Sequence, residues 1–122
     1  MKNTHNRILG EWGEGIAADF LTARGYEILA RNIRTPAGEI DLLARRGGLL
    51  VFIEVKTRRG EGFGPPEEAI TAVKQQHMED SALAWLAEHP GEGGNWQFDV
   101  IAIYQPPDDR QPEITHLEGM LD

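Results

Sequence analysis

The chain has 122 residues, which suits one compact domain of about 100–150 residues and leaves no room for a second. It has no cysteine, which excludes disulfides, thiolate metal sites and cysteine nucleophiles and fits a reducing compartment. The formal charge of −8 argues at first sight against a nucleic-acid partner, because phosphate neutralisation supplies most non-specific affinity. No apolar run approaches the roughly 18 residues of a membrane span, and the first residues lack a signal-peptide core. We therefore expect a soluble, cytoplasmic protein without a membrane partner.

The first half of the chain predicts one helix and three strands. Apolar residues at three- and four-residue spacing indicate a helix from about Thr4 to Arg24, with an inner face made of Ile8, Trp12, Ile16, Ala17, Phe20 and Leu21. Strand-like content follows over 26–33, and 35–38 read as a turn. Strands over 39–44 and 49–57 are joined by a tight connection, which predicts an antiparallel hairpin.

The second half predicts a helix between two loops and then one or two strands. The loop over 60–66 is rich in glycine and proline, and we expect it to be mobile over an active site. A helix is predicted from Pro66 to Glu88, with an inner face made of Ile70, Val73, His77, Leu83 and Leu86. Strands are predicted over 96–104 and 113–117. This order indicates a single α/β domain over residues 1–122, a sheet of mixed direction covered by helices.

The average charge conceals a strong asymmetry. Residues 24–59 hold eight basic and four acidic side chains, a local balance of +4, so the remainder carries −12. A local basic patch can steer a polyanion despite the wrong total, although exposed arginines also simply solubilise a protein. The candidates for contacts to backbone phosphates are Arg31, Arg34, Arg58 and Arg59.

Four charged residues stand inside the two apolar strands of the predicted hairpin. Glu39 and Asp41 lie on the first strand, and Glu54 and Lys56 on the second. Each such charge costs several kcal/mol unless it is paired or bound to a metal. Because strand side chains alternate between faces, each pair shares one face and the four groups converge. Lys56 neutralises only one acid, so we expect two uncompensated carboxylates and hence a bound cation.

Magnesium is the cation that these groups suit. It prefers octahedral oxygen ligation, which Asp41 and Glu54 supply, with the backbone carbonyl of Val55 as a further oxygen. Such an ion binds a phosphate oxygen and lowers the pKa of a coordinated water. Lys56 then orients the water or offsets charge on the phosphorane-like transition state. A general-base role would need a strongly lowered Lys56 pKa, which the adjacent carboxylates oppose.

The two strands together also resemble a known signature. Gly38–Glu39–Ile40–Asp41–Leu42–Leu43 followed by Phe52–Ile53–Glu54–Val55–Lys56–Thr57–Arg58 resembles the PD-(D/E)xK nuclease motif, with Ile40 where the name has proline. In detail the chain resembles the YraN family of small bacterial predicted endonucleases over nearly its full length. Further points of resemblance are Gly10 to Gly15 with Glu14, Ala17–Ala18, Leu21, Gly25–Tyr26, Arg31–Asn32 and Lys74.

The resemblance implies a restriction-endonuclease-like fold, a mixed β-sheet flanked by helices with an αβββαβ core, similar to archaeal Holliday-junction resolvases. It places Asp41, Glu54 and Lys56 at the catalytic positions, and Glu14 at the acidic position of the first helix as a second-metal or water-shell ligand. Resolvase-like folds often act as dimers because two strands must be cut, so a homodimer is one expectation.

Several other residues are open to two interpretations. Asp99 either faces the same pocket or is a capped or salt-bridged structural residue. Lys74 either reaches a phosphate or supports the site, although such residues more often form a solvated helix face. The four histidines lack zinc-ligand spacing, which favours surface or packing roles. The tryptophans Trp12, Trp85 and Trp96 are expected in the core.

Three hypotheses follow. The first is a Mg²⁺- or Mn²⁺-dependent endonuclease that hydrolyses DNA phosphodiester bonds, with selectivity for branched or junction DNA as one form. The second is a non-catalytic module on the same fold that binds nucleic acid or a protein. The third is a purely structural ion-pair cluster, for which Asp41→Asn destabilises the fold and Mg²⁺ does not raise the melting temperature.

Overall fold

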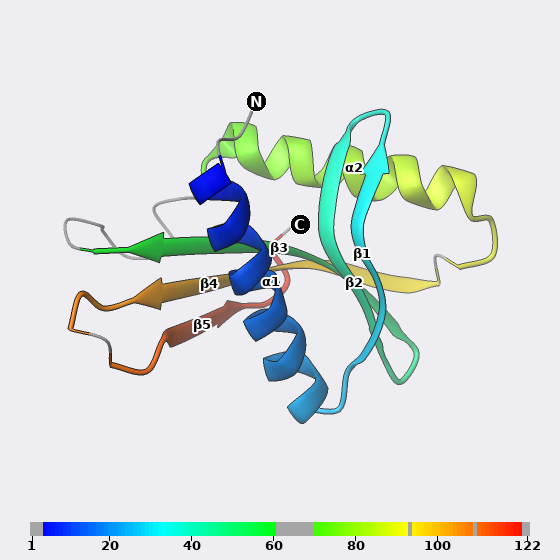
Figure 1. Ribbon diagram of the computed structural model, residues 1–122. Coiled ribbons are helices and arrows are strands. Elements are labelled where there is room, and N and C mark those ends of the chain that lie inside the picture. The colour runs from blue at the N-terminus through cyan, green and yellow to red at the C-terminus, as the bar shows by residue number, and fades with distance from the viewer. Residues whose placement is uncertain (1–3, 61–69, 93, 109, 121–122) are drawn as a thin grey trace.

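The computed structural model describes residues 4–60, 70–92, 94–108 and 110–120, with the side chains of 4–7 left out. Two helices and five strands lie in these ranges (Figure 1). They are α1 (Thr4–Ala23), β1 (Glu27–Thr35), β2 (Gly38–Arg46), β3 (Leu49–Arg59), α2 (Ala72–Glu88), β4 (Asn95–Gln105) and β5 (Glu113–Leu117).

The strands form one sheet in the order β1-β2-β3-β4-β5. Neighbouring strands are antiparallel except β3 and β4, which are parallel over their whole lengths. Parallel neighbours need a crossover connection, and α2 lies in that connection between β3 and β4. The predicted hairpin and the predicted mixed sheet are both confirmed.

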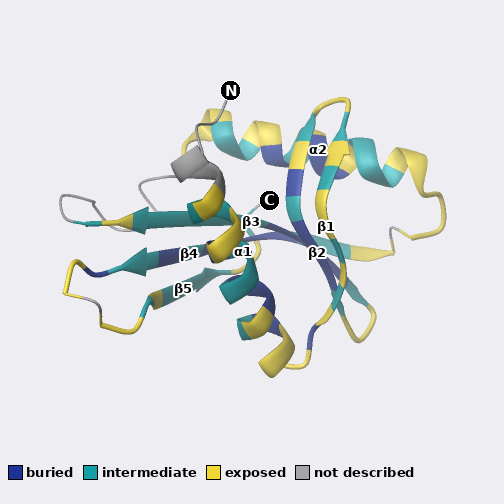
Figure 2. Ribbon diagram, in the orientation of Figure 1, coloured by how far each residue is buried: buried dark blue, intermediate teal, exposed yellow. Residues whose placement is uncertain are grey.

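The sheet carries a helix and a hydrophobic core on each face. On one face α1 packs through Ala17, Ala18 and Leu21 against residues such as Val51 and Ile53. On the other, α2 packs through Met78 and Ala82 against a cluster that includes Phe52. Figure 2 shows the buried residues gathered along the middle of the strands, beneath the two helices. The central strand β3 therefore contributes to both cores, as its run of buried residues over 50–53 requires.

One end of β2 parts from β3 and reaches α2. Pairing of β2 with β3 ends at Leu42 opposite Ile53, whereas pairing with β1 continues to Gly38. Ile40 packs in the α2-side core and Leu42 in the α1-side core, so simple alternation of faces fails between them. The β1–β2 hairpin rises past α2 in Figure 1, and a Cβ on Gly38 would lie 2.8 Å from Ser81 Oγ. The hairpin tip, β3 and α2 thus enclose a space.

The bounds of α1 agree with the prediction, but its inner face is partly wrong. Ile8 is 58% exposed and Trp12 is 38% exposed, so neither belongs to the core. Both side chains lie near the start of the helix and line a surface cavity with Arg59, Arg110 and Pro112 instead. The other two tryptophans pack against the α2-side core as expected.

The second helix differs more from its prediction. Ile70 and Thr71 are not helical, and the Thr71 side chain caps the helix by accepting a hydrogen bond from the Lys74 N–H. Residues 61–69, which include the predicted start and most of the predicted mobile loop, lie outside the described residues. Val73 and Leu83 are exposed, and the buried residues are Met78, Ser81 and Ala82. The small side chain of Ser81 lies where the hairpin tip approaches the helix closely.

Candidate active site

The space between the β2 end, β3 and α2 is a cavity of about 340 Å³. Asp41 enters its wall from β2, while Glu54, Val55 and Lys56 enter from β3. The helix α2 adds Lys74 and three further residues on the same face, His77, Met78 and Ser81. The residues that the motif predicted to meet therefore surround one cavity.

Asp41 stands where β2 parts from β3. Its Oδ2 accepts a hydrogen bond of 2.8 Å from the backbone N–H of Val55, which takes the place of a ladder bond from β2. Because the N–H and C=O of one strand residue point to the same edge, the Val55 carbonyl also lies on the side of Asp41. Two of the three predicted metal ligands thus share this edge of β3.

Glu54 has one oxygen paired and one unpaired. Its Oε1 lies 2.7 Å from Lys74 Nζ, and its side chain is only 18% exposed. Its Oε2 is buried and has no hydrogen-bond partner among the described residues. A buried carboxylate oxygen without a partner costs about 1–3 kcal/mol or more, so it is uncommon in a folded protein.

The two lysines of the cavity have opposite pKa shifts. Burial lowers the pKa of Lys56, the charge of Glu54 opposes this, and the hydrogen bond and charge of Lys74 reinforce it. Burial acts downward on Lys74 as well, but the hydrogen bond and charge of Glu54 outweigh it and raise the Lys74 pKa. The carboxylates do oppose a lowered Lys56 pKa, as predicted, yet burial and the second ammonium prevail.

The charge balance of the site differs from the prediction. Glu39 is exposed and lies 3.4 Å from the exposed Arg34, so it is not an uncompensated acid. Asp41 and Glu54 face two ammonium groups rather than one, because Lys74 arrives from α2. The expected excess of two carboxylates is wrong, since it counted only the charges of the hairpin.

The donor set nevertheless fits Mg²⁺ or Mn²⁺. Asp41 and Glu54 line the same cavity, and the Val55 carbonyl lies on the side of Asp41. Hard cations of this kind prefer such oxygen ligands. The unpartnered Glu54 Oε2 is a free ligand position, since it binds nothing else among the described residues.

Comparison with known proteins gives the chain its family. The model of the uncharacterised protein family UPF0102 matches residues 13–103, a range that includes both strands of the motif. The chain belongs to UPF0102. A UPF0102 protein of Geotalea daltonii is 48% identical over 117 residues, covering 96% of this chain and 91% of that protein. One of Symbiobacterium thermophilum is 51% identical over 105 residues, covering 86% and 89%.

Among solved structures, Pyrococcus furiosus SfsA in complex with Ca²⁺ aligns with this UPF0102 chain at a TM-score of 0.38 and 16% identity. The alignment covers 96% of this chain and 65% of that one. No described helix of this UPF0102 member is long and apolar enough to cross a membrane.

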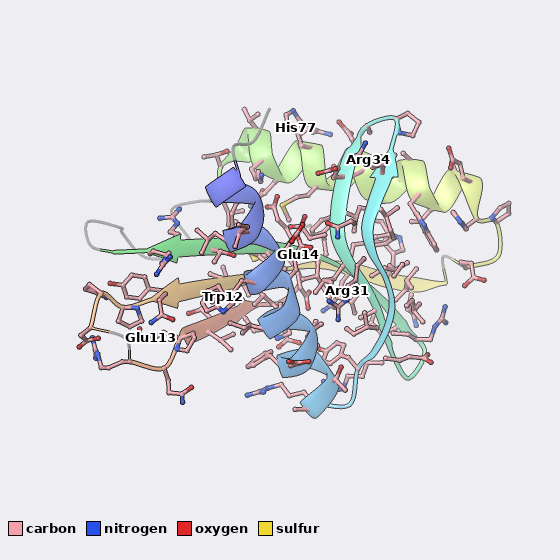
Figure 3. The ribbon with its side chains drawn as sticks, in the orientation of Figure 1. Trp12, Glu14, Arg31, Arg34, His77 and Glu113 are labelled. Atoms are coloured by element: carbon pink, nitrogen blue, oxygen red, sulfur yellow. The ribbon has the colours of Figure 1, made fainter. Side chains whose placement is uncertain are left out.

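Glu14 lies on α1, outside the set of described residues that line the cavity. Its neighbour Gly13 marks where α1 crosses β3, because a Cβ at Gly13 would collide with the Thr57 hydroxyl. Glu14 is half-buried, beside that crossing (Figure 3). Its role as a supporting ligand stays a prediction.

The candidate phosphate contacts come from two separate strands. Arg31 and Arg34 are exposed on the edge strand β1, with Arg34 nearer the hairpin tip (Figure 3). Arg58 and Arg59 stand at the end of β3, two strands away in the sheet order, and Arg59 lines the second cavity beside α1. Lys74, also predicted to contact nucleic acid, is paired with Glu54.

Asp99 belongs to a different cluster. It is fully buried, and its Oδ2 lies 2.8 Å from Nε2 of His116, a ring that packs edge-on against Phe20 and Tyr26 on the α1 side of the sheet. Of the two interpretations from sequence, the structural one holds. Oxygen and nitrogen atoms of Asp99, His116 and Glu118 also lie within 4.8 Å of one another, a spacing that would allow a metal.

Sequence reasoning named Lys74 of α2 as a candidate but missed that three further residues of this helix line the cavity. His77 was expected in the core, but it is exposed at the cavity, and Ser81 received no structural role. The available signal was spacing: Lys74, His77, Met78 and Ser81 are three, four and seven residues apart and so share one helix face.

Proposed function

We propose that this UPF0102 protein is a metal-dependent nuclease that hydrolyses DNA phosphodiester bonds. The observation that carries the proposal is the cavity in which Asp41, Glu54 and Lys56 meet while the buried Glu54 Oε2 has no partner. Burying so many ionisable groups at one place lowers stability, and such clusters are typical of functional sites. The proposal includes a restriction-endonuclease-like fold of the PD-(D/E)xK type, to which the order of helices and strands corresponds.

Asp41 and Glu54 would hold Mg²⁺ or Mn²⁺, with the Val55 carbonyl as a further oxygen ligand. When bound, such an ion supplies a Lewis acid for the phosphate and lowers the pKa of a coordinated water. The hydrogen bond from the Val55 N–H fixes Asp41 Oδ2 beforehand, so the ligand needs little reorganisation.

Lys56 would act beside these ligands on the reacting phosphate. Its ammonium orients the attacking water and offsets the negative charge that grows in the transition state. Glu14, one residue from the contact of α1 with β3, would support the site from the other helix.

DNA is the proposed substrate, and the chain is proposed to work in the cytoplasm. Arg31 and Arg34 on β1 and Arg58 and Arg59 on β3 would contact backbone phosphates from two separate strands of the sheet. A branched or junction DNA presents phosphate backbones in two directions. This arrangement suits arginines that stand on two separate β-strands of the protein. A homodimer would allow both strands of a duplex to be cut.

One observation favours a second candidate, the structural ion-pair cluster. Among the described residues, Lys74 and Lys56 balance Asp41 and Glu54, and Arg34 pairs with Glu39, all without any metal. For this candidate, as for a non-catalytic binding module, the carboxylates would have no catalytic role.

The deciding experiment is cleavage of labelled single-stranded, duplex, flap and four-way-junction DNA by the purified chain with Mg²⁺, Mn²⁺ or EDTA. We expect cutting that needs the metal and falls at least roughly a hundredfold in both Asp41→Asn and Lys56→Ala. Asp108→Asn is the matched control, because it makes the same chemical change in an exposed ion pair with Arg110.

Each other result selects another candidate. Junction binding without cutting in the wild type supports the binding module. If nothing is cut or bound and Asp41→Asn unfolds the chain, the cluster is structural. Cutting that survives Asp41→Asn would contradict the site assignment.

A further inference from the structure

The cavity holds two carboxylates and two ammonium groups, and a divalent cation would upset the balance of their charges. Among the described residues of the cavity wall, Asp41 and Glu54 carry two negative charges, and Lys56 and Lys74 carry two positive ones. A third acid of the wall, Glu39, is exposed and already paired with Arg34. A bound Mg²⁺ would leave an excess of two positive charges in a partly buried space. A phosphodiester brings only one negative charge, so one ammonium must change its contacts when metal and substrate bind.

Lys74 is the lysine whose ammonium is best placed to change its contacts. Its Nζ lies 2.7 Å from Glu54 Oε1, so it occupies one oxygen of a proposed metal ligand, while the other oxygen has no partner. Its side chain is 31% exposed and comes from α2, whereas Lys56 is fixed on the central strand β3. Withdrawing Lys74 therefore requires only a change of rotamer on one exposed helix turn.

We propose that Lys74 is an internal counter-ion of the site that exchanges Glu54 for the substrate phosphate when a divalent cation binds. In the metal-free protein its ammonium satisfies Glu54 and keeps the carboxylate in place. With the cation bound, Glu54 is fully used as a ligand, and the released ammonium faces the incoming phosphodiester. This inference rests on the proposed function, since it assumes that Asp41 and Glu54 bind a divalent cation.

The exchange predicts two opposite effects of Lys74→Gln. Without the competing ammonium, Mn²⁺ should bind roughly tenfold more tightly than to the wild type, measured by titration calorimetry of the full chain. Binding of four-way-junction DNA in Ca²⁺, measured by fluorescence anisotropy, should weaken by about threefold to tenfold because a phosphate contact is lost. A purely structural lysine would not move the two affinities in opposite directions.

Arg45→Gln is the charge-matched control. It removes one positive charge from an exposed pair with Glu92, at the opposite end of β2 from Asp41. We expect its Mn²⁺ affinity to match that of the wild type. An equal gain in this variant would show that net charge alone explains the effect and would overturn the exchange.

The outcomes separate this inference from the proposed function. If the wild type binds Mn²⁺ and Lys74→Gln binds it no more tightly, the exchange is wrong and the nuclease proposal stands. If neither folded protein binds Mn²⁺, the metal site itself is wrong and both fall.

A measurement on the wild type covers the case in which Lys74→Gln does not fold. The chain has three lysines, so the side-chain nitrogen signals of ¹⁵N-lysine protein are few enough to assign. Saturating Ca²⁺ should shift the Lys74 signal strongly. A Lys74 signal that stays in place while Ca²⁺ binds would overturn the exchange.

Discussion

Asp99 and Glu54 are carboxylates on neighbouring strands and opposite faces of the sheet. Both oxygens of Asp99 are satisfied: Oδ1 accepts from Gln97 Nε2 and the Gly119 N–H, each at 2.9 Å, and Oδ2 contacts His116. Glu54 has one satisfied oxygen and one buried oxygen without a described partner. The comparison teaches that deep burial and an unsatisfied oxygen are separate properties, because Asp99 is the more buried of the two and yet has both oxygens satisfied.

Asp99 and Glu54 differ in how much their contacts contribute to the fold. Asp99 ties β4 to β5 through His116 and to the residues just after β5 through Gly119, so its hydrogen bonds hold these two segments together. Glu54 faces a cavity, and the ion-pair partner that the described residues give it is Lys74, a lysine that is partly exposed. Asp99 is saturated with described partners, whereas Glu54, the proposed metal ligand, has one oxygen without a described partner.

The largest effect should come from substituting each carboxylate by its amide. Asp99→Asn puts an NH₂ where both oxygens accept hydrogen bonds, and we expect a loss of about 2–4 kcal/mol in the free energy of unfolding. Glu54→Gln should cost less than about 1 kcal/mol, because it also removes a poorly satisfied buried charge. Urea denaturation of both variants measures this difference. Equal losses would break the comparison.

A smaller effect should come from adding metal. At about ten times its dissociation constant, Mg²⁺ should add about 1.4 kcal/mol of stability, which for a chain of this size is roughly 5 °C in melting temperature. The shift should vanish in Asp41→Asn and persist in His116→Ala. The reverse pattern would place the metal at Asp99, His116 and Glu118 instead.

The smallest effect concerns the two lysines within the cavity. A lowered pKa gives Lys56 more free amine at a given alkaline pH, and a raised pKa gives Lys74 less. In EDTA, the acetylation rate of Lys56 should therefore reach its plateau at lower pH than that of Lys74. Mass spectrometry of labelled peptides over a pH series checks the order. Coinciding profiles would remove the electrostatic distinction between the two lysines.

Much of the site was predictable because its parts are local. The hairpin of β2 and β3 depends on two apolar runs and a tight turn, and a hairpin makes residues near its strands neighbours whatever else the chain does. The meeting of Asp41 with the segment around Glu54 and Lys56 follows from that pairing alone. The helix α1 was likewise predictable from the spacing of its apolar residues, and the edge strand β5 from its composition.

The remainder depended on contacts between distant segments. Alternation predicts faces for a flat strand, but β2 turns between Ile40 and Leu42 as the hairpin bends toward α2, and no local pattern records that bend. The inner face of α2 was mistaken in part because the polar Ser81 is buried where Gly38 approaches the helix closely, and not by its hydrophobicity.

The sequence by itself determined the elements, the mixed sheet and the pairing of the two motif strands, because these follow from periodicity and turn chemistry within short stretches. Only the tertiary structure decided that Lys74 pairs with Glu54, that Asp99 serves the opposite face with His116, and that Glu54 Oε2 is left without a described partner. The physical reason is that ion pairs and burial depend on which side chains of distant segments meet, and that is fixed by packing.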